Sequence, residues 1–152
     1  MGTQLPLEAD HFLVRKITLG DVEEVARLHE AQNERPADRE YIGRCIADVP
    51  SSLALQGERL VGFVYGRSFA PDLLWLTNLL VDEEYRGRGI GRRLFEHVEE
   101  QARTRWAGIL FSNSDLWPHP PRPSPEGFYL RLGYEKVWTT AHTAVYVKRL
   151  VS

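Results

Sequence analysis

The stretch from Val81 to Glu100, VDEEYRGRGIGRRLFEHVEE, places glycines at 87, 89 and 91 among four arginines and then continues as a helical pattern. An apolar segment at 72–81, DLLWLTNLLV, leads straight into it. The first N–H groups of a helix have no partner within the helix, and the helix dipole adds positive potential there, so an anion is favoured. Glycines remove the side chains that would keep a phosphate away. The stretch therefore predicts a phosphate or pyrophosphate site between a buried strand and a helix.

Three interpretations of the glycines compete with one another. A dinucleotide-binding turn has the spacing G-x-G-x-x-G and an acidic residue at the end of the next strand, whereas the spacing here is G-x-G-x-G and Asp115 comes late. A P-loop ends in G-K-S or G-K-T, and the stretch contains no lysine. The third interpretation is a plain turn with solvated arginines. The arginines concerned are Arg86, Arg88, Arg92 and Arg93.

Apolar patterns on both sides of the glycines predict an α/β chain. Asp21 and Ser124 stand where helix N-caps are expected, and Pro50 and Gly133 stand where helices should end. The order strand, glycine turn, helix, strand in the middle of the chain indicates a right-handed crossover unit. The predicted strands are 11–18, 51–56, 59–69, 72–81, 106–113, 134–138 and 143–150, and the predicted helices are 19–31, 39–49, 91–102 and 125–132.

Length and composition are those of one domain with one core. Of 152 residues, 43% are hydrophobic, so we expect a flexible N-terminus at 1–11 and one domain at 12–152. A formal charge of −2, with both signs mixed along the chain, predicts neither a nucleic-acid nor a membrane partner. A single cysteine excludes an intramolecular disulfide, and the histidines lack the spacing of metal ligands, so we expect no metal. Because the start shows no signal-peptide pattern, we expect a cytoplasmic protein.

Two motifs, in the right order, resemble those of the GCN5-related N-acetyltransferases. The segment LLVDEEYRGRGIGRRL at 79–94 is similar to their acetyl-coenzyme A (acetyl-CoA) binding segment: an apolar strand, a short acidic loop, then Arg-x-x-Gly-x-Gly as Arg86, Gly89 and Gly91. The segment FYLRLGYEK at 128–136 resembles the later signature of the family, an aromatic-tyrosine pair on a short helix followed by Leu-Gly-Tyr. Two motifs separated by a helix and a strand are far more specific than either motif alone.

The resemblance covers about residues 12 to 150 and carries expectations about fold and activity. It implies a single-domain α/β (α+β) fold with a mixed, mostly antiparallel sheet of about seven strands, flanked by about four helices and splayed between strands 4 and 5. It also implies an acetyl-CoA-dependent N-acetyltransferase, in which a primary amine attacks the thioester directly. A second function class stays open, a sensor or interaction module that binds acyl-CoA without transferring the acyl group.

The same resemblance implies roles for individual residues. The strand from Leu79 to Val81 would pair with the pantetheine arm through its backbone, and the N–H groups from Arg86 to Arg92 would cradle the pyrophosphate. An asparagine often precedes the last helix in this family and contacts the pantetheine; here that contact falls to Asn113 or is absent. Tyr129 matches the tyrosine that protonates the departing sulfur. The cofactor-binding residues so implied are Leu79, Leu80, Val81, Arg86, Gly87, Arg88, Gly89, Ile90, Gly91, Arg92, Asn113 and Tyr129.

The general base is where this sequence departs from the family pattern. Many members carry a glutamate in the fourth strand, and LLWLTNLLV at 73–81 contains no carboxylate. Thr77 or Asn78 could hold a water molecule in its place. Asp115, beyond the fifth strand, is our first candidate for the base, and its alternative role is that of a turn-forming aspartate.

Three segments are expected to frame the amine acceptor, at 30–40, 114–125 and 138–142. They offer carboxylates that would attract a cation and tryptophans that would form apolar or cation-binding walls. We expect a small-molecule or peptide amine as acceptor, and a late strand could also support a homodimer. The substrate-binding residues predicted on this basis are Glu30, Glu34, Trp117 and Trp138.

Overall fold

A seven-stranded sheet runs through the computed structural model, which describes residues 11–115 and 124–150. The expected flexible N-terminus at 1–11 lies almost wholly outside the described residues. The strand order is β1-β2-β3-β4-β5-β7-β6, and all neighbours are antiparallel except β4 and β5. This confirms the mixed, mostly antiparallel sheet. The strands are β1 (Leu13–Arg15), β2 (Ser52–Gln56), β3 (Arg59–Ala70), β4 (Leu73–Val81), β5 (Gly108–Ser114), β6 (Glu135–Thr139) and β7 (Thr143–Arg149).

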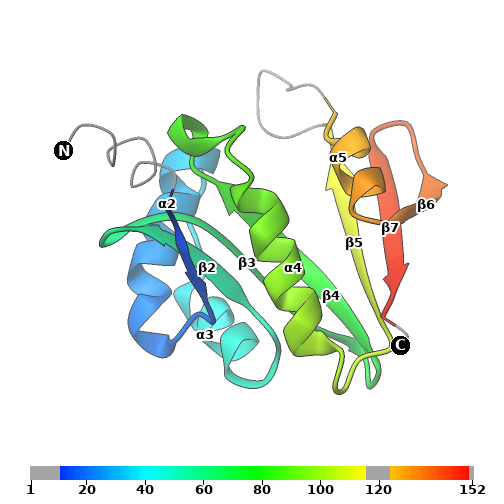
Figure 1. The fold of residues 1–152 in the computed structure, drawn as a ribbon, viewed down its shortest axis with the longest axis horizontal. Coiled ribbons are helices and arrows are strands. Elements are labelled where there is room, and N and C mark those ends of the chain that lie inside the picture. Colours follow the sequence, from blue (N-terminus) through cyan, green and yellow to red (C-terminus); the bar gives the residue numbers. More distant parts are fainter. Residues whose placement is uncertain (1–10, 116–123, 151–152) are drawn as a thin grey trace.

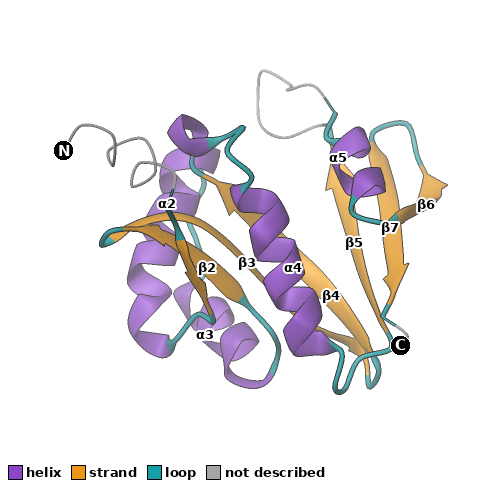
Figure 2. Cartoon of the chain, in the orientation of Figure 1, coloured by secondary structure: helices purple, strands orange, loops and turns teal. Residues whose placement is uncertain are grey.

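Helices cover both faces of this sheet, with α4 across one face and α2 and α3 behind the other (Figures 1 and 2). Each face has its own buried cluster: Leu94 and Val98 of α4 belong to the first, and Ile42 of α3 packs with Phe63 in the second. No helix in the described part of the chain has the length and apolarity needed to cross a bilayer. The α-helices of the described residues are α2 (Val22–Asn33), α3 (Arg39–Asp48), α4 (Ile90–Ala102) and α5 (Glu126–Arg131).

The helix starts show where local sequence signals hold and where they do not. Asp21 does not cap α2 with its side chain but ends a 3-10 turn, where its carboxylate accepts a hydrogen bond from the Thr18 N–H at 2.8 Å. It also pairs with Arg15 at 2.8 Å, and this guanidinium lowers the pKa of Asp21 to about 2. The N-cap of α5 is Pro125 rather than Ser124, which lies one residue earlier and accepts a hydrogen bond from the Glu126 N–H at 3.2 Å.

The predicted splay lies between β4 and β5. These strands pair only from Leu73 to Trp75 in β4. The pairing of β3 with β4 then shifts register between Tyr65 and Gly66, and Thr77 is the extra residue of this bulge. A bulge bends a strand, and a Cβ at Gly66 would overlap the Trp75 carbonyl oxygen, so the glycine permits this bend. The C-terminal halves of β4 and β5 are thereby separated.

Candidate active site

The glycine turn connects β4 to α4 and exposes backbone at the helix start. Gly87 and Gly89 have φ angles of 80° and 81°, which favour glycine, and a Cβ built on either would meet no atom within 4 Å beyond its chain neighbours. Gly89 is the N-cap of α4, and its carbonyl accepts the N–H of Arg93 at 3.2 Å. The N–H groups of the first helical residues have no partner within the helix. Backbone donors with open space in front of them suit an anion.

Gly91 has a different role from the other two glycines of the turn. A Cβ at this position would lie 3.2 Å from Cζ of Phe128, which is tighter than ordinary contact. The missing side chain therefore lets α5 pack on the first turn of α4. Phe128 belongs to the aromatic-tyrosine pair of the later motif, so the two motifs meet in space.

Two arginines of the turn are oriented by neighbouring groups. Arg86 donates from Nε to the Val81 carbonyl at the end of β4, at 3.1 Å. The guanidinium of Arg88 lies over the Tyr85 ring at 5.0 Å, and that of Arg59 lies over the same ring at 5.1 Å. This arrangement keeps positive charge beside the exposed backbone.

The next two arginines, Arg92 and Arg93, contact other residues of the chain. Arg92 pairs with Glu96 of the same helix at 3.2 Å. Arg93 donates to the Phe12 carbonyl at 2.9 Å and so ties the chain before β1 to α4. All four arginines of the turn are exposed, and each also has a partner within the fold.

A cavity of about 1050 Å³ opens between the splayed ends of β4 and β5 and extends to the glycine turn. This volume is at the upper end of the range for small-molecule sites. Every residue predicted to bind the cofactor lines it, except Arg88, whose neighbour Tyr85 does. Asp115 lines it as well. The described residues contain no group of three side chains that could hold a metal ion.

Tyr129 enters this cavity from α5 and is surrounded by aromatic rings. Its side chain is 7% exposed, with ring centroids of Phe111 and Tyr146 at 4.7 and 4.9 Å. Burial raises the pKa of Tyr129 to about 12, because the phenolate would lose its hydration. The hydroxyl is therefore protonated at neutral pH and suited to donate a proton.

Asp115 is held against the turn that joins β6 to β7. Its N–H donates to the His142 carbonyl at 2.9 Å, and its Oδ1 lies 3.0 Å from Nδ1 of His142. Both side chains line the cavity, and both are more than half exposed. The cavity thus contains a carboxylate-imidazole pair contributed by two segments 27 positions apart in the chain.

The polar residues of β4 are bonded within the fold. Thr77 accepts a hydrogen bond from the Tyr41 hydroxyl at 3.3 Å. The Asn78 amide nitrogen lies 3.0 Å from Nδ1 of His29 and donates to the Tyr65 hydroxyl at 3.0 Å. These contacts face α2 and α3, whereas the described cavity lining takes Leu79, Leu80 and Val81 from β4.

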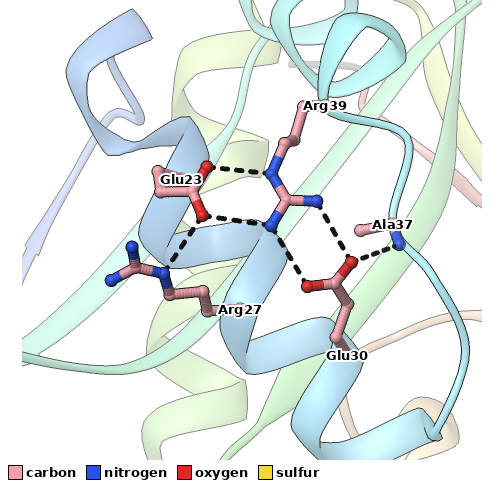
Figure 3. A network of polar contacts seen from close by, with 5 residues as sticks. All are labelled: Glu23, Arg27, Glu30, Ala37 and Arg39. Atoms are coloured by element: carbon pink, nitrogen blue, oxygen red, sulfur yellow. Dashed lines mark hydrogen bonds and ion pairs between the residues drawn. The ribbon is translucent and has the colours of Figure 1, made fainter.

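Glu30 is part of an ionic network between α2 and α3 (Figure 3). Its two carboxylate oxygens accept hydrogen bonds from Arg39, both at 3.1 Å, and one of them also accepts the Ala37 N–H at 3.0 Å. Arg39 bonds Glu23 as well, at 2.8 and 3.0 Å. The Arg39 guanidinium holds the pKa of Glu30 below its ordinary value. The carboxylate predicted to attract the acceptor thus has partners within the fold.

The other predicted acceptor residues lie in varied places. Glu34 is exposed at the end of α2 with φ of 54°, a left-handed conformation that is uncommon for this residue type. Its neighbour Asn33 lines the cavity. Trp138 lies on β6 with 64% of its surface exposed. Trp117 lies outside the described residues.

Sequence reasoning missed several residues of the cavity. Asn33 and His142 fall in segments expected to frame the acceptor, but neither was singled out. Tyr85 and Phe128 lie within the two motifs but were given no role at the site, and Tyr146 had only the pattern of a buried strand. The three framing segments do meet here, since residues from the end of α2, from 114–115 and 124–125, and from the 139–142 turn all line it.

Comparisons with known proteins agree with this geometry. A family model described as an acetyltransferase (GNAT) domain matches residues 50–136. The blasticidin-S acetyltransferase of Streptomyces morookaense is 37% identical over 75 residues, which are 49% of this chain and 48% of that protein. The match thus spans about half the length of that relative.

Solved structures resemble almost the whole chain. The ribosomal-protein-S18-alanine N-acetyltransferase from Escherichia coli has a TM-score of 0.76 at 14% identity and covers 93% of this chain and 96% of its own. An aminoglycoside 6'-N-acetyltransferase complexed with coenzyme A has a TM-score of 0.75 at 19% identity, over 92% and 98%. At these identities the likeness shows the fold alone. Because the family model covers more than half of the residues, the chain belongs to the GNAT family of acetyltransferase domains.

Proposed function

We propose that the protein is an acetyl-CoA-dependent N-acetyltransferase, in which a primary amine attacks the thioester directly. One observation carries the proposal: a single cavity is lined both by the glycine turn at the start of α4 and by Tyr129. The turn offers backbone donors to an anion, and the buried phenol offers a proton. Membership in the GNAT family supports the same activity.

The residues of β4 and of the turn fit a coenzyme A donor. Gly87 and Gly89 leave the backbone of the turn open, which suits a pyrophosphate. The pairing of β4 with β5 ends at Trp75, so the strand from Leu79 to Val81 has a backbone edge beside the cavity. An extended arm can pair with such an edge through main-chain hydrogen bonds. Asn113 lies across the cavity on β5 and offers an amide.

The transfer needs a group that removes a proton from the amine and a group that gives one to the departing sulfur. Acetyl-CoA supplies the acyl group as a thioester. Tyr129 is the proton donor in this proposal, since its pKa of about 12 keeps the hydroxyl protonated at the pH of the cell. Asp115, the first candidate for the base in the sequence, lines the same cavity.

The acceptor is proposed to be a small-molecule or peptide amine. The end of α2 and the 139–142 turn line the same cavity as the glycine turn, so an amine that enters between them can approach the donor. One relative is a blasticidin-S acetyltransferase, one fold neighbour acts on an aminoglycoside and another on an alanine of a ribosomal protein. The acceptors of these proteins include both small molecules and a protein, which supports an amine acceptor but does not identify which amine.

The test is release of free thiol from acetyl-CoA by the purified chain in the presence of single amines. The panel contains blasticidin S, an aminoglycoside, spermidine, free amino acids and a short peptide with an N-terminal alanine. We expect release that depends on one class of amine and on the amount of protein. Binding of acetyl-CoA without release with any amine would instead favour a sensor or interaction module.

A further inference from the structure

We infer that His142 is the general base of the proposed transfer and that Asp115 is its positioning residue. The inference rests on the proposed function and changes the role that Asp115 had in the sequence analysis. Among the described lining residues, the side chains with a carboxylate or an imidazole are Asp115, Glu126 and His142.

The fourth strand, where many GNAT proteins carry a glutamate, offers no base in this chain. Thr77 and Asn78 stand at the bulge of β4 and are not among the described lining residues of the cavity; their side chains bond Tyr41, Tyr65 and His29. Neither a hydroxyl nor an amide accepts a proton at neutral pH. The base must therefore come from another edge of the cavity.

Glu126 is a poor candidate for the general base because of its contacts. It stands in the first turn of α5, close in sequence to the proposed acid Tyr129, and its carboxylate forms an ion pair with Lys136 of β6. A carboxylate engaged in this way must break the ion pair before it can accept a proton from the amine. The remaining groups are Asp115 and His142, which are bonded to each other.

The backbone around His142 is held on both sides. The Thr140 N–H donates to the Thr143 carbonyl at 2.8 Å, and the Thr143 N–H donates to Oγ1 of Thr140 at 3.0 Å, which closes the turn. The Asp115 N–H donates to the His142 carbonyl at 2.9 Å. The position of this imidazole is thus set by the end of β5 and the start of β7.

The contact between the two side chains decides which nitrogen can act. Oδ1 of Asp115 lies 3.0 Å from Nδ1 of His142. An ionised carboxylate only accepts hydrogen bonds, so Nδ1 must carry the hydrogen, and the lone pair of the neutral ring is then at Nε2. Imidazole is a stronger base than a carboxylate near neutral pH. Asp115 orients the ring, and His142 accepts the proton.

In the transfer, Nε2 of His142 takes a proton from the acceptor nitrogen as the new C–N bond forms at the acetyl carbonyl carbon. The C–S bond breaks, and the hydroxyl of Tyr129 gives its proton to the sulfur. One proton is taken and one is given, so the balance closes when His142 releases its proton to water and Tyr129 regains one. The side chain of His142 is 57% exposed, which leaves it open to this exchange.

Charged and titratable groups from several elements line the same cavity as His142. The described cavity lining contributes Asp115 at the end of β5, Glu126 and Tyr129 from α5, and Tyr146 from β7. The arginines of the glycine turn, Arg86 and Arg92, line the same cavity. A variant at any of these groups changes the electrostatic field at the imidazole, so the test leaves them untouched apart from Asp115.

The experiment measures kcat/KM and kcat against pH for the wild type and for His142→Gln, Asp115→Asn and the double variant, with acetyl-CoA and the amine that the wild type acetylates. His11→Gln is the control, because His11 is exposed and outside the described cavity lining. We expect His142→Gln to lower kcat/KM about 100-fold at pH 7 and Asp115→Asn about tenfold. The loss in His142→Gln should shrink as pH rises, because the amine then loses its proton to water.

The double variant separates a functional pair from a structural one. If Asp115 acts through His142, the double variant is no slower than His142→Gln alone, whereas independent roles multiply the two losses. The dissociation constant of acetyl-CoA and the melting temperature of each variant should stay near those of the wild type. A His142→Gln variant within twofold of the wild type at every pH would overturn the base assignment alone. A wild type that releases no thiol with any amine would overturn the proposed function itself.

Discussion

The two strands that border the cavity contribute to it in different ways. From Leu79 to Val81, β4 lines the cavity with backbone and apolar side chains, and its polar side chain at Asn78 is bonded to residues on the α2 side. At the end of β5, polar residues line the cavity instead: Asn113 in the strand and Asp115 just beyond it. A backbone edge can hold an extended ligand, whereas proton transfer needs a titratable side chain. In the proposed transfer, β4 would therefore hold the donor, and the end of β5 would serve the reacting amine.

Two histidines, one near each strand, differ in the same way. His29, behind β4, has the amide nitrogens of Asn33 and Asn78 at 3.2 and 3.0 Å from Nδ1. Amide nitrogens donate, so Nδ1 of His29 is an acceptor and its lone pair is occupied. His142, beyond β5, donates from Nδ1 to a carboxylate and keeps the lone pair of Nε2 for a substrate. The first imidazole is bonded within the fold, and the second is the proposed base.

The largest effect on kcat is expected from Tyr129, the proposed proton donor. Tyr129→Phe should lower kcat about 100- to 1000-fold and leave the dissociation constant of acetyl-CoA within about twofold, because a general acid acts only as the sulfur departs. Thiol release under saturating acetyl-CoA measures kcat, and calorimetry measures the affinity.

Tyr134→Phe is the matched control for that variant. Tyr134 belongs to the same aromatic cluster, with its ring 5.0 Å from that of Phe111, but its hydroxyl donates to the buried Glu99 at 3.0 Å. Removal of that hydroxyl should lower stability and leave kcat unchanged. Equal losses of kcat in the two variants would show that Tyr129 contributes packing rather than a proton.

An intermediate effect, on the affinity for acetyl-CoA, is expected from the glycine turn that follows β4. Gly89→Ala should weaken acetyl-CoA binding about tenfold and change kcat little, because a side chain at φ of 81° strains the backbone that presents the anion-binding N–H groups. The measurement is the dissociation constant of acetyl-CoA by calorimetry.

Gly57→Ala is the control, because it introduces a similar backbone strain at a position that does not line the described cavity. Gly57 has φ of 61°, and a Cβ there would also meet no atom within 4 Å beyond its chain neighbours. Both variants should lose stability, and only Gly89→Ala should lose affinity. An unchanged affinity in Gly89→Ala would remove the glycine turn from the donor site.

The smallest effect is expected from substitution of His29, and it should appear in the pH dependence of the free energy of unfolding. Burial lowers the pKa of His29 in the fold, so the unfolded chain binds the proton first as pH falls. The stabilisation from neutral His29 is therefore present above the unfolded value of about 6.5 and is lost as pH falls through the folded pKa. His29→Gln should show a smaller drop in the free energy of unfolding between pH 7 and pH 5 than the wild type.

Urea unfolding at the two pH values measures that difference. His11→Gln should keep the drop of the wild type, since His11 is exposed. If His29→Gln lowers kcat/KM about as much as His142→Gln while its stability keeps the pH dependence of the wild type, the distinction between the two histidines fails.

The fold could be predicted closely where the signals are local. The helix expected at 39–49 is α3, Arg39–Asp48, because Asp38 caps its start by accepting the Tyr41 N–H at 3.0 Å and Pro50 follows its end. The strand expected at 11–18 is only Leu13–Arg15, because the length of an edge strand depends on how far its neighbour pairs with it. Asp21 likewise bonds Arg15 and Thr18 instead of capping the helix that follows.

By itself, the sequence determined the family, the glycine turn and the position of Tyr129, because each depends on residues within one short segment whose backbone conformation is local. Only the tertiary structure decided which polar groups have free atoms at the cavity. Asp115 and His142 meet because β5 pairs with β7, and the amide nitrogen of Asn78 is engaged because His29 and Tyr65 lie beside it. Hydrogen bonds between distant segments depend on the packed fold, and no spacing along the chain specifies them.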